Sequence, residues 1–335
     1  MTEAHWLRIW SRRGAWACLL WPVSKLYQGL IWTRRLLYRR GWLTSTRLPV
    51  PVVVVGNVWV GGTGKTPITM ALAQKLGEMG WRVGVISRGH GRQAQEAMLV
   101  RHDSLPAEVG DEPLLIHRKT HIPVAVCGRR VDAARLLLQT HPDVNLIISD
   151  DGMQHMALKA DLVCCVFDQR RLGNGWVLPA GPLREPWPLR GQDRPPTWLL
   201  SSEQPPWQNA WQITRRLSER AVNGLGQECR WVDLPSPVNV LAAIGQPQAF
   251  FQAVRERGLE PHTTLALPDH DDLQNWQPDR GQTWLCTEKD AVKIWPRHPH
   301  VWAIPLCVDL PEALWAELNR FLLARLSSPY GSKTA

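Results

Sequence analysis

A glycine-rich stretch that ends in Lys65 and Thr66 carries residues of the kind that hold phosphate groups. Glycines let backbone N–H groups close around phosphate oxygens, the lysine balances their charge, and the threonine hydroxyl can ligate Mg²⁺. The strict motif has glycine at position 59, where this chain has Trp59, so a glycine-rich hairpin before an ordinary helix is the alternative. We expect the phosphate cradle to comprise Trp59, Val60, Gly61, Gly62, Thr63, Gly64, Lys65 and Thr66.

Two carboxylates, Asp150 and Asp151, follow an apolar run at residues 143–149. Carboxylates directly after a buried strand have the form of a Walker B element, which holds Mg²⁺ against the β- and γ-phosphates of a nucleotide. An ordinary Asp-Asp-Gly turn is the alternative. Gln154 comes shortly afterwards and is expected to point toward the same site. Together with the glycine-rich stretch, this pattern predicts a protein that binds ATP and Mg²⁺.

Two acidic segments are candidates for proton transfer. Asp111 and Glu112 precede an apolar segment, where they either favour the start of a helix or supply a carboxylate that accepts a proton from an attacking hydroxyl. Asp269 precedes His270, as in a histidine that is oriented by a neighbouring acid. A polar loop is an equally good interpretation of that second pair.

Three arginines are candidate contacts for an anionic substrate. Arg88 lies in a basic, glycine-rich loop after the expected strand at residues 82–86, and α/β folds bind ligands at the C-terminal ends of their strands. Arg130 follows the expected strand at residues 124–127. Arg184 lies in a proline-rich stretch, whose arginines would look the same in a solvated linker.

Predicted strands and helices alternate along most of the chain, which indicates an α/β fold. We expect a P-loop NTPase-like, mainly parallel sheet with helices on both faces, and a smaller C-terminal α/β domain that ends in a strand at 301–308 and a helix at 312–326. The expected division is a basic, aromatic-rich arm at 1–48, a P-loop core at 49–225 and a smaller domain at 226–335 that closes the cleft. Within the core, the mostly irregular stretch at 179–208 is expected to be a lid or linker.

The positive charge of the chain is concentrated in its first 50 residues. The net charge is +9, and residues 1–50 carry nine Lys or Arg side chains against the single acid Glu3, so the remainder is nearly neutral. This distribution argues against a nucleic-acid groove on the folded body. Arginines interleaved with apolar and aromatic residues favour an amphipathic helix at an anionic membrane surface. A helix packed on the domain itself, or a spanning helix, are the alternatives, although Pro22 interrupts the longest apolar run.

Seven cysteines without a Cys-x-x-Cys pair favour a reduced, cytosolic protein with free thiols and make a zinc site improbable.

Seven short motifs occur in one order and together resemble the tetraacyldisaccharide 4′-kinases of lipid A biosynthesis. They are Gly-Gly-Thr-Gly-Lys-Thr-Pro, Ser-Arg-Gly-x-Gly-Arg, Gly-Asp-Glu-Pro, Asp-Asp-Gly-x-Gln-His, Leu-Pro-Ala-Gly-Pro-Leu-Arg-Glu, Asp-His and Thr-Glu-Lys-Asp-Ala-Val-Lys. The resemblance covers residues from about 50 to 293, and the N-terminal arm fits it as well. His90 stands where that family usually has tyrosine.

The resemblance implies transfer of the γ-phosphate of ATP to the 4′-hydroxyl of an acylated glucosamine disaccharide 1-phosphate, which gives lipid IVA. It implies that Asp111 and His270 act as a general-base pair, and that Asp150 and Asp151 hold Mg²⁺. Gln154 and Arg184 match active-site motif positions. The implied location is the cytoplasmic face of the inner membrane, on an anionic surface and with no obligate protein partner.

A membrane-associated P-loop ATPase switch with a deviant Walker A motif is the rival interpretation. Such proteins usually carry an extra lysine directly before the paired glycines, and this chain has Val60 there. A kinase of small molecules or nucleotides would leave the basic arm without a role.

Overall fold

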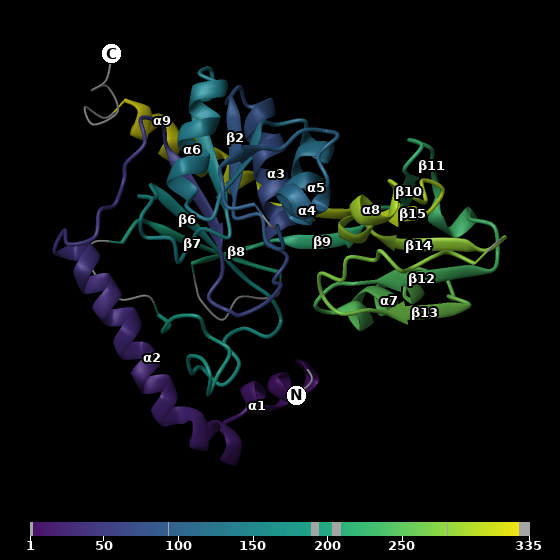
Figure 1. Cartoon of the computed structure of the whole chain (residues 1–335), viewed down its shortest axis with the longest axis horizontal. Helices are drawn as coiled ribbons and strands as arrows, with labels where there is room; N and C mark the ends of the chain where they lie inside the picture. The colour runs from purple at the N-terminus through teal and green to yellow at the C-terminus, as the bar shows by residue number, and fades with distance from the viewer. Residues whose placement is uncertain (1–2, 93, 189–193, 203–208, 280, 328–335) are drawn as a thin grey trace.

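The structure is a computed structural model that describes residues 3–92, 94–188, 194–202, 209–279 and 281–327. The expected lid or linker at 179–208 therefore lies partly outside the described residues. Two sheets form the bulk of the molecule and lie next to each other, joined by a short two-stranded ribbon (Figure 1). The N-terminal helices extend away from both sheets.

The first sheet has the strand order β3-β4-β2-β5-β1-β6-β7-β8, and all of its neighbouring strands are parallel except β3 and β4. Its strands are β1 (Val52–Gly56), β2 (Val83–Ser87), β3 (Met98–Leu99), β4 (Val124–Val126), β5 (Leu146–Asp150), β6 (Leu162–Phe167), β7 (Thr197–Ser201) and β8 (Ala210–Gln212). Strand β7 lies inside the stretch that the sequence analysis expected to be mostly irregular.

Successive valines of β1 point to opposite faces of this sheet, and helices cover both faces. Val53 and Val55 belong to the core beneath α3 (Lys65–Glu78), α5 (Asp111–Thr120) and α9 (Glu312–Leu326). Val52 and Val54 belong to the core beneath α6 (Arg130–Thr140). A strand buried on both faces is typical of a parallel α/β sheet, so the expected fold class is confirmed.

The second sheet has the order β11-β10-β15-β14-β12-β13, with parallel pairs from β15 to β13 and antiparallel pairs at β10. Its elements are β10 (Arg220–Asn223), β11 (Glu228–Arg230), the 3₁₀ turn η1 (Trp231–Asp233), β12 (Val238–Ala242), α7 (Pro247–Arg255), β13 (Thr263–Ala266), β14 (Thr283–Thr287), α8 (Glu288–Ile294) and β15 (Trp302–Ile304). Helix α8 packs against α5 of the first domain, beside the short helix α4 (Pro106–Val109).

Strands β9 (Thr214–Leu217) and β16 (Leu306–Asp309) pair antiparallel and carry the chain into and out of the second sheet. Pro305 separates β16 from β15 because it cannot donate to a strand ladder, so the expected single strand at 301–308 is wrong. Helix α9 occupies the expected range and packs on the first sheet. The division at 225/226 stays a prediction, and we propose that residues 220–304 form the second domain, with α9 belonging to the first.

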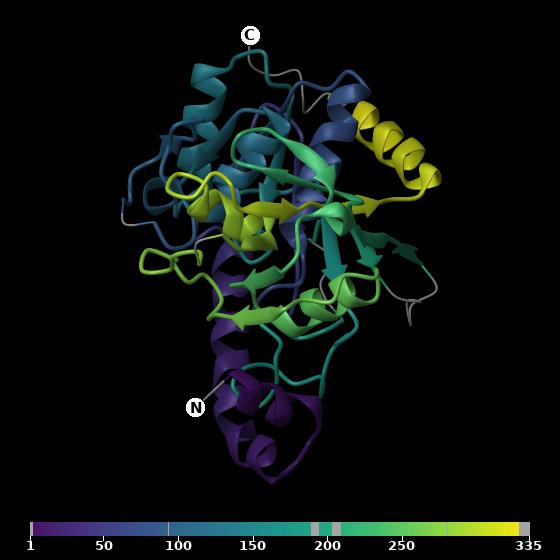
Figure 2. The same cartoon turned by 90° about the vertical axis from the view of Figure 1, so that its right-hand side faces the viewer.

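The N-terminal arm forms α1 (Glu3–Ser11) and α2 (Ala15–Arg39), which extend beneath the body in Figure 2. One side of α2 contacts the segment around residues 177–185: Ser24 Oγ donates to Val177 O at 2.9 Å, and Tyr27 Oη donates to Arg184 O at 3.1 Å. Its other side exposes Leu26 and Leu30 at 72% and 69%. None of the helices in the described ranges has both the length and the hydropathy needed to cross a membrane.

Candidate active site

The glycine-rich loop joins β1 to α3, with Lys65 as the first residue of the helix. Gly61 and Gly64 have φ values of 91° and 70°, a region that glycine adopts readily, and the space next to Gly61 and Gly62 is open. Thr63 Oγ1 is buried without a hydrogen-bond partner among the described residues. An open glycine cradle with an unpartnered hydroxyl fits a ligand rich in hydrogen-bond acceptors, such as a polyphosphate.

Trp59 and Val60 precede the open part of this cradle. The Trp59 side chain is only 4% exposed, and the guanidinium of Arg170 lies 4.9 Å from the centre of its ring. The Val60 N–H donates to Pro182 O at 2.9 Å, so in this structure it is not directed at the cradle. Contact of these two residues with a nucleotide stays a prediction; in the structure Trp59 packs in the core and the backbone of Val60 is bonded to Pro182.

Two arginines that were not among the expected cradle residues contact the loop. Arg170 donates to Gly62 O and to the Asp168 carboxylate, and Arg215 of β9 donates to Thr63 O at 2.8 Å. Arg170 belongs to a basic segment that the sequence shows, whereas Arg215 lies in no recognisable motif. Both arginines place positive charge beside the expected phosphates.

Lys65 lies between polar groups of the first sheet. Its Nζ donates to Asn57 Oδ1 at 3.3 Å and lies 3.5 Å from Asp151 Oδ1. Burial would raise the pKa of Asp151, but the charges of Lys65 and Arg184 lower it below its ordinary value. The lysine ammonium is therefore held at the cradle by groups that phosphate oxygens could replace.

Asp150 is fully buried at the end of β5 and accepts a hydrogen bond from Thr69 Oγ1 at 2.8 Å. Burial and the nearby charge of Glu112 raise its pKa to about 7, although Lys65 opposes them. A carboxyl group with so high a pKa is poised to gain a cation, because a divalent ion stabilises its charged form. Together with Asp151 and the Thr66 hydroxyl, it is a donor set that fits Mg²⁺, which usually takes one or two carboxylates and phosphate oxygens.

Arg184 contacts Asp151 of this carboxylate pair, and Gln154 in turn contacts Arg184. Arg184 Nη1 donates to both oxygens of Asp151, at 2.8 and 3.1 Å. Gln154 Nε2 donates to Asn57 O at 3.0 Å and to Glu185 Oε1 at 2.9 Å. The structure thus places Gln154 and Arg184 beside the expected metal carboxylates, where each one orients protein groups.

Arg88 and Arg130 lie in a basic cluster around His155. Burial and then the charges of Arg130, Arg34, Arg129 and Arg88 lower the pKa of His155 to about 4. The Arg130 side chain is buried, and its Nε has no partner in the described part of the chain. Several cations around a neutral imidazole form a site for an anion. Arg34 was missed because it comes from α2, far away in the sequence.

Asp111 and His270 meet across the interface between the two domains. Asp111 begins α5, His270 follows β13, and their Oδ2 and Nδ1 atoms are 3.1 Å apart. Burial would raise the pKa of Asp111, but the hydrogen bond to His270 and the charge of Lys289 lower it to about 2. The bond to Asp111 raises the pKa of His270, although burial and Lys289 oppose this. The imidazole of His90 packs on that of His270, with ring centres 4.8 Å apart.

Two lysines of α8 support this pair. Lys289 Nζ lies 3.1 Å from both Asp269 Oδ1 and His270 Nε2. Lys293 Nζ donates to Asp271 O at 2.7 Å and lies 3.9 Å from Asp111 Oδ2. The motif Thr-Glu-Lys-Asp-Ala-Val-Lys was recognised in the sequence, but its spacing alone does not show that both lysines face His270 or its loop.

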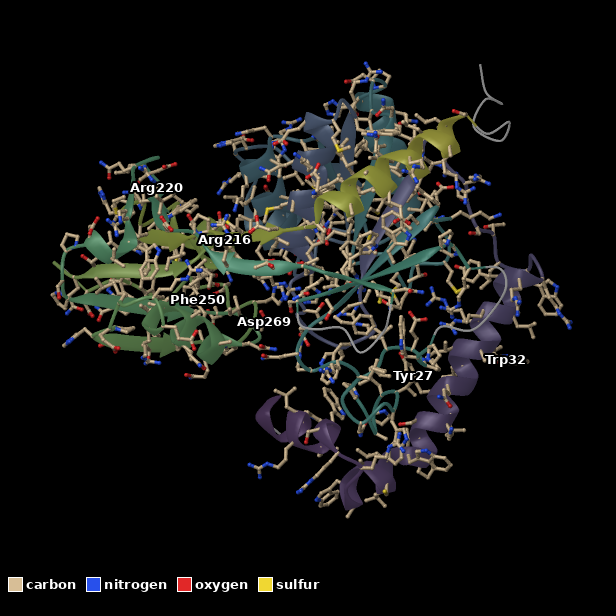
Figure 3. The ribbon with its side chains drawn as sticks, turned by 180° about the vertical axis from the view of Figure 1, so that it is seen from behind. Tyr27, Trp32, Arg216, Arg220, Phe250 and Asp269 are labelled. Carbon is tan, nitrogen blue, oxygen red and sulfur yellow. The ribbon has the colours of Figure 1, made fainter. Side chains whose placement is uncertain are left out.

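One cavity of about 570 Å³ extends from the phosphate loop to the second domain. Lys65, Thr66, Glu112 and Lys289 line its polar side, and an apolar wall includes Phe250 of α7. In Figure 3, Asp269 lies at the edge of the second domain next to the first, and Phe250 lies further into the second domain. Several expected site residues do not contribute to the wall of this cavity: Trp59, Arg88, Asp111, Arg130, Asp150, Asp151, Gln154 and His270. Asp111 and His270 lie directly behind it, since their neighbours Glu112, Asp269 and Lys289 line it.

A glycine-rich cradle, a buried carboxylate pair suited to Mg²⁺ and an acid–histidine pair whose neighbours Glu112, Asp269 and Lys289 line the same cavity are together typical of a P-loop phosphotransferase. The model of the family described as LpxK, tetraacyldisaccharide-1-P 4′-kinase, matches residues 16–323, and the chain belongs to that family.

Curated relatives agree with this assignment. The chain is 50% identical over 324 residues to the tetraacyldisaccharide 4′-kinase of Acidovorax sp. (strain JS42), with 95% of this chain and 94% of the relative covered. It is 45% identical to that of Polaromonas naphthalenivorans (strain CJ2), with 98% of each chain covered. Among solved structures, the "apo" form of LpxK from Aquifex aeolicus in complex with ATP matches with a TM-score of 0.78 and 29% identity. That match covers 93% of this chain and 99% of the other.

Proposed function

We propose that the protein transfers the γ-phosphate of ATP to the 4′-hydroxyl of a tetraacyldisaccharide 1-phosphate, which gives lipid IVA. The observation that carries this proposal is the single cavity with Lys65 and Thr66 at one side and Lys289 and Asp269, neighbours of His270, at the other. An ATP molecule in the cradle would direct its γ-phosphate toward a hydroxyl beside the acid–histidine pair. Membership of the 4′-kinase family supports the choice of acceptor.

His270 Nε2 is the proposed proton acceptor, with Asp111 as its partner. A carboxylate whose pKa is about 2 is a weak base, whereas a histidine with a raised pKa accepts a proton readily. The 4′-oxygen forms its bond to the γ-phosphorus as its proton moves to Nε2, and the bond from that phosphorus to the ADP oxygen breaks. Asp111 stabilises the imidazolium through its hydrogen bond to Nδ1.

Lys65, the N–H groups of the cradle and Arg170 are the groups that we propose hold the polyphosphate. Thr66, Asp150 and Asp151 are the proposed Mg²⁺ ligands. Mg²⁺ held by these groups would offset the negative charge that develops on the phosphoryl group during transfer. Arg184 keeps Asp151 in place through its two hydrogen bonds.

The basic cluster around His155 is the proposed site for the phosphate group of the lipid substrate. Arg88 and Arg130 come from the first domain and Arg34 comes from α2, so the cluster connects the body to the arm. A phosphate there would be held close to α2, whose outer side exposes apolar residues. This arrangement suits a substrate with a charged headgroup and acyl chains.

The outer side of α2 is the proposed membrane contact, on the cytoplasmic face of the inner membrane. Figure 3 shows Trp32, which is 65% exposed, on the side of α2 away from the body and Tyr27 on the side toward it. Exposed leucine and tryptophan next to arginine favour the headgroup region of anionic lipids.

Sedimentation with vesicles that contain anionic phospholipid tests this contact. The double variant Leu26→Glu/Leu30→Glu should lose most vesicle binding, because it removes apolar insertion and adds negative charge. Leu225→Glu is the matched control, since Leu225 is 52% exposed and lies between β10 and β11, which are at the opposite end of the molecule from α2 in Figure 1. Equal sedimentation of the arm variant and the control would assign membrane binding to another surface.

Thin-layer chromatography with γ-labelled ATP and the acylated disaccharide 1-phosphate in detergent micelles tests the proposed reaction. The purified chain should move the label to the lipid in the presence of Mg²⁺. Release of the label as inorganic phosphate alone would instead support an ATPase switch.

A further inference from the structure

Lys289 is positioned against the atom that must accept the proton. Its Nζ lies 3.1 Å from His270 Nε2, 3.1 Å from Asp269 Oδ1 and 3.6 Å from Glu112 Oε1. The side chain is 18% exposed and lines the cavity beside the phosphate loop. It therefore contacts both domains at the point where they meet.

The contact with Nε2 fixes which histidine nitrogen carries the proton. Burial would lower the pKa of Lys289, but Glu112, Asp111 and Asp269 raise it, so the lysine is charged and acts only as a donor. Nε2 must then be the acceptor, and Nδ1 carries the hydrogen that is donated to Asp111. In this arrangement the lone pair of His270 Nε2 accepts a hydrogen bond from Lys289, so it cannot at the same time accept a proton from the substrate.

We propose that Lys289 caps His270 Nε2 while the cleft holds no nucleotide, and that it transfers its hydrogen bonds to the γ-phosphate when ATP binds, which frees Nε2 to act as the base. This inference rests on the proposed function and adds a positioning role that couples nucleotide binding to the state of the base. An ammonium group forms stronger hydrogen bonds with phosphate oxygens than with a neutral imidazole. The cavity connects Lys289 directly to the cradle, and the lysine side chain is long and flexible.

Lys293, one turn further along α8, provides a comparison, because its ammonium group is buried and has partners in the second domain. It is 6% exposed, its Nζ donates to Asp271 O at 2.7 Å, and it pairs with the buried Asp290 at 3.4 Å. These partners hold the loop that carries His270. Lys293 does not line the cavity, so the exchange is assigned to Lys289 alone.

Nucleotide affinities provide the first test. Calorimetry should compare Mg²⁺ with AMP-PNP, a non-hydrolysable ATP analogue, and Mg²⁺ with ADP, using the full chain. Lys289→Met should weaken AMP-PNP binding by about tenfold or more and change ADP binding by less than about twofold, because ADP lacks the γ-phosphate. Lys119→Met is the matched control, since it removes another interdomain lysine, which pairs with Glu288 at 2.8 Å, without touching His270.

The titration of His270 in the nucleotide-free chain provides the second test. NMR of labelled histidine, assigned with His270→Asn, should show that Lys289→Met raises the pKa of His270 by about one unit, because a nearby cation is removed. The other groups that contact His270 are unchanged in this variant: Asp111 of α5, Asp269 of its own loop and His90 of the loop after β2. The charged groups next to these contacts are unchanged as well: Glu112 lies beside Lys289, and Lys293 lies beside Asp111.

Lys289→Gln controls for a folding defect in Lys289→Met. Its amide can still donate hydrogen bonds to His270 Nε2 and Asp269, but the positive charge is removed. It should lose the preference for AMP-PNP as Lys289→Met does. If both variants keep the wild-type ratio of AMP-PNP to ADP affinity, or if the pKa of His270 does not move, the exchange is wrong and Lys289 only joins the domains. Neither readout requires turnover. Failure of the wild-type chain to phosphorylate the lipid would overturn the proposed function. The nucleotide affinities and the titration of His270 test only the proposed role of Lys289.

Discussion

The two sides of the cleft are assembled differently. The phosphate loop takes its groups from one continuous strand–loop–helix unit, from β1 to the first turn of α3. Asp111 and His270 are 159 positions apart and come from different domains. The first side is therefore complete within one domain, whereas the proposed base is complete only when the second domain lies against α5.

This difference separates binding from chemistry. Substitutions in the phosphate loop should impair both nucleotide binding and transfer, because they act on phosphate charge throughout the reaction. Substitutions in the acid–histidine pair should impair transfer alone, since their contact matters in the transition state. The predictions below test that separation, beginning with the largest effect.

Lys65→Ala should lower kcat by about 10³-fold or more and weaken ATP binding, because the charge that balances the phosphates is removed. Lipid phosphorylation and calorimetry measure the two effects, and thermal unfolding checks the fold. Lys75→Ala in the same helix is the control, since the Lys75 side chain is 40% exposed and its only ion pair among the described residues is with Glu78. Activity of Lys65→Ala within tenfold of the wild type would contradict the phosphate-loop assignment.

His270→Ala should lower kcat by about 10²- to 10⁴-fold, the usual contribution of a general base. ATP affinity should stay nearly constant because His270 lies outside the phosphate loop. His262→Ala is the matched control, since His262 is an exposed histidine of the same domain. A loss of ATP affinity as large as the loss of kcat would contradict the view that the phosphate loop binds the nucleotide and the acid–histidine pair acts only in transfer.

Asp111→Asn should move the acidic limb of the pH–rate profile to lower pH by about one unit and lower the plateau. The reason is that His270 must be neutral to accept a proton, and its bond to Asp111 raises its pKa. Activity should therefore fall as the pH drops below this raised pKa. The profile of kcat/KM against pH measures the limb, and an unchanged limb would mean that His270 is not the titrating base.

Lys119→Met should have the smallest effect, a change in kcat of less than about threefold and a stability loss of less than about 1 kcal/mol. Its pair with Glu288 joins α5 to α8, but both side chains keep some contact with water. Steady-state kinetics and thermal unfolding measure these changes. A hundredfold loss of kcat would show that the domains depend on this pair to close.

The sequence predicted best what is local. The valine strand, the glycine-rich loop and the helix that begins at Lys65 lie next to one another, so their order was readable from the sequence, and the fold class was predicted correctly. That the loop holds phosphate stays a prediction. Helix α9 was predicted at Glu312–Leu326, but an apolar helix face does not reveal which of two sheets it covers. Pro305 ends β15 because it has no N–H to donate to the strand ladder. The residues after it form β16, which pairs with β9.

The residues around the proposed base were harder to predict from the sequence. Asp111 and His270 were paired through family resemblance, because no pattern along the chain brings positions 159 apart into contact. Lys289 and Arg34 were missed for the same reason, since α8 and α2 reach the site only through tertiary packing. Their roles follow from distances and from the charges that surround His270 and His155.

A double-mutant cycle on Asp111 and His270 tests the central claim most directly. Values of kcat for lipid phosphorylation should be measured for Asp111→Ala, His270→Ala and the double variant. In the proposed mechanism the two residues act as one base, so the second substitution should add little to the loss caused by the first. Losses that multiply would show that Asp111 and His270 act independently and would contradict a base assembled across the domain interface.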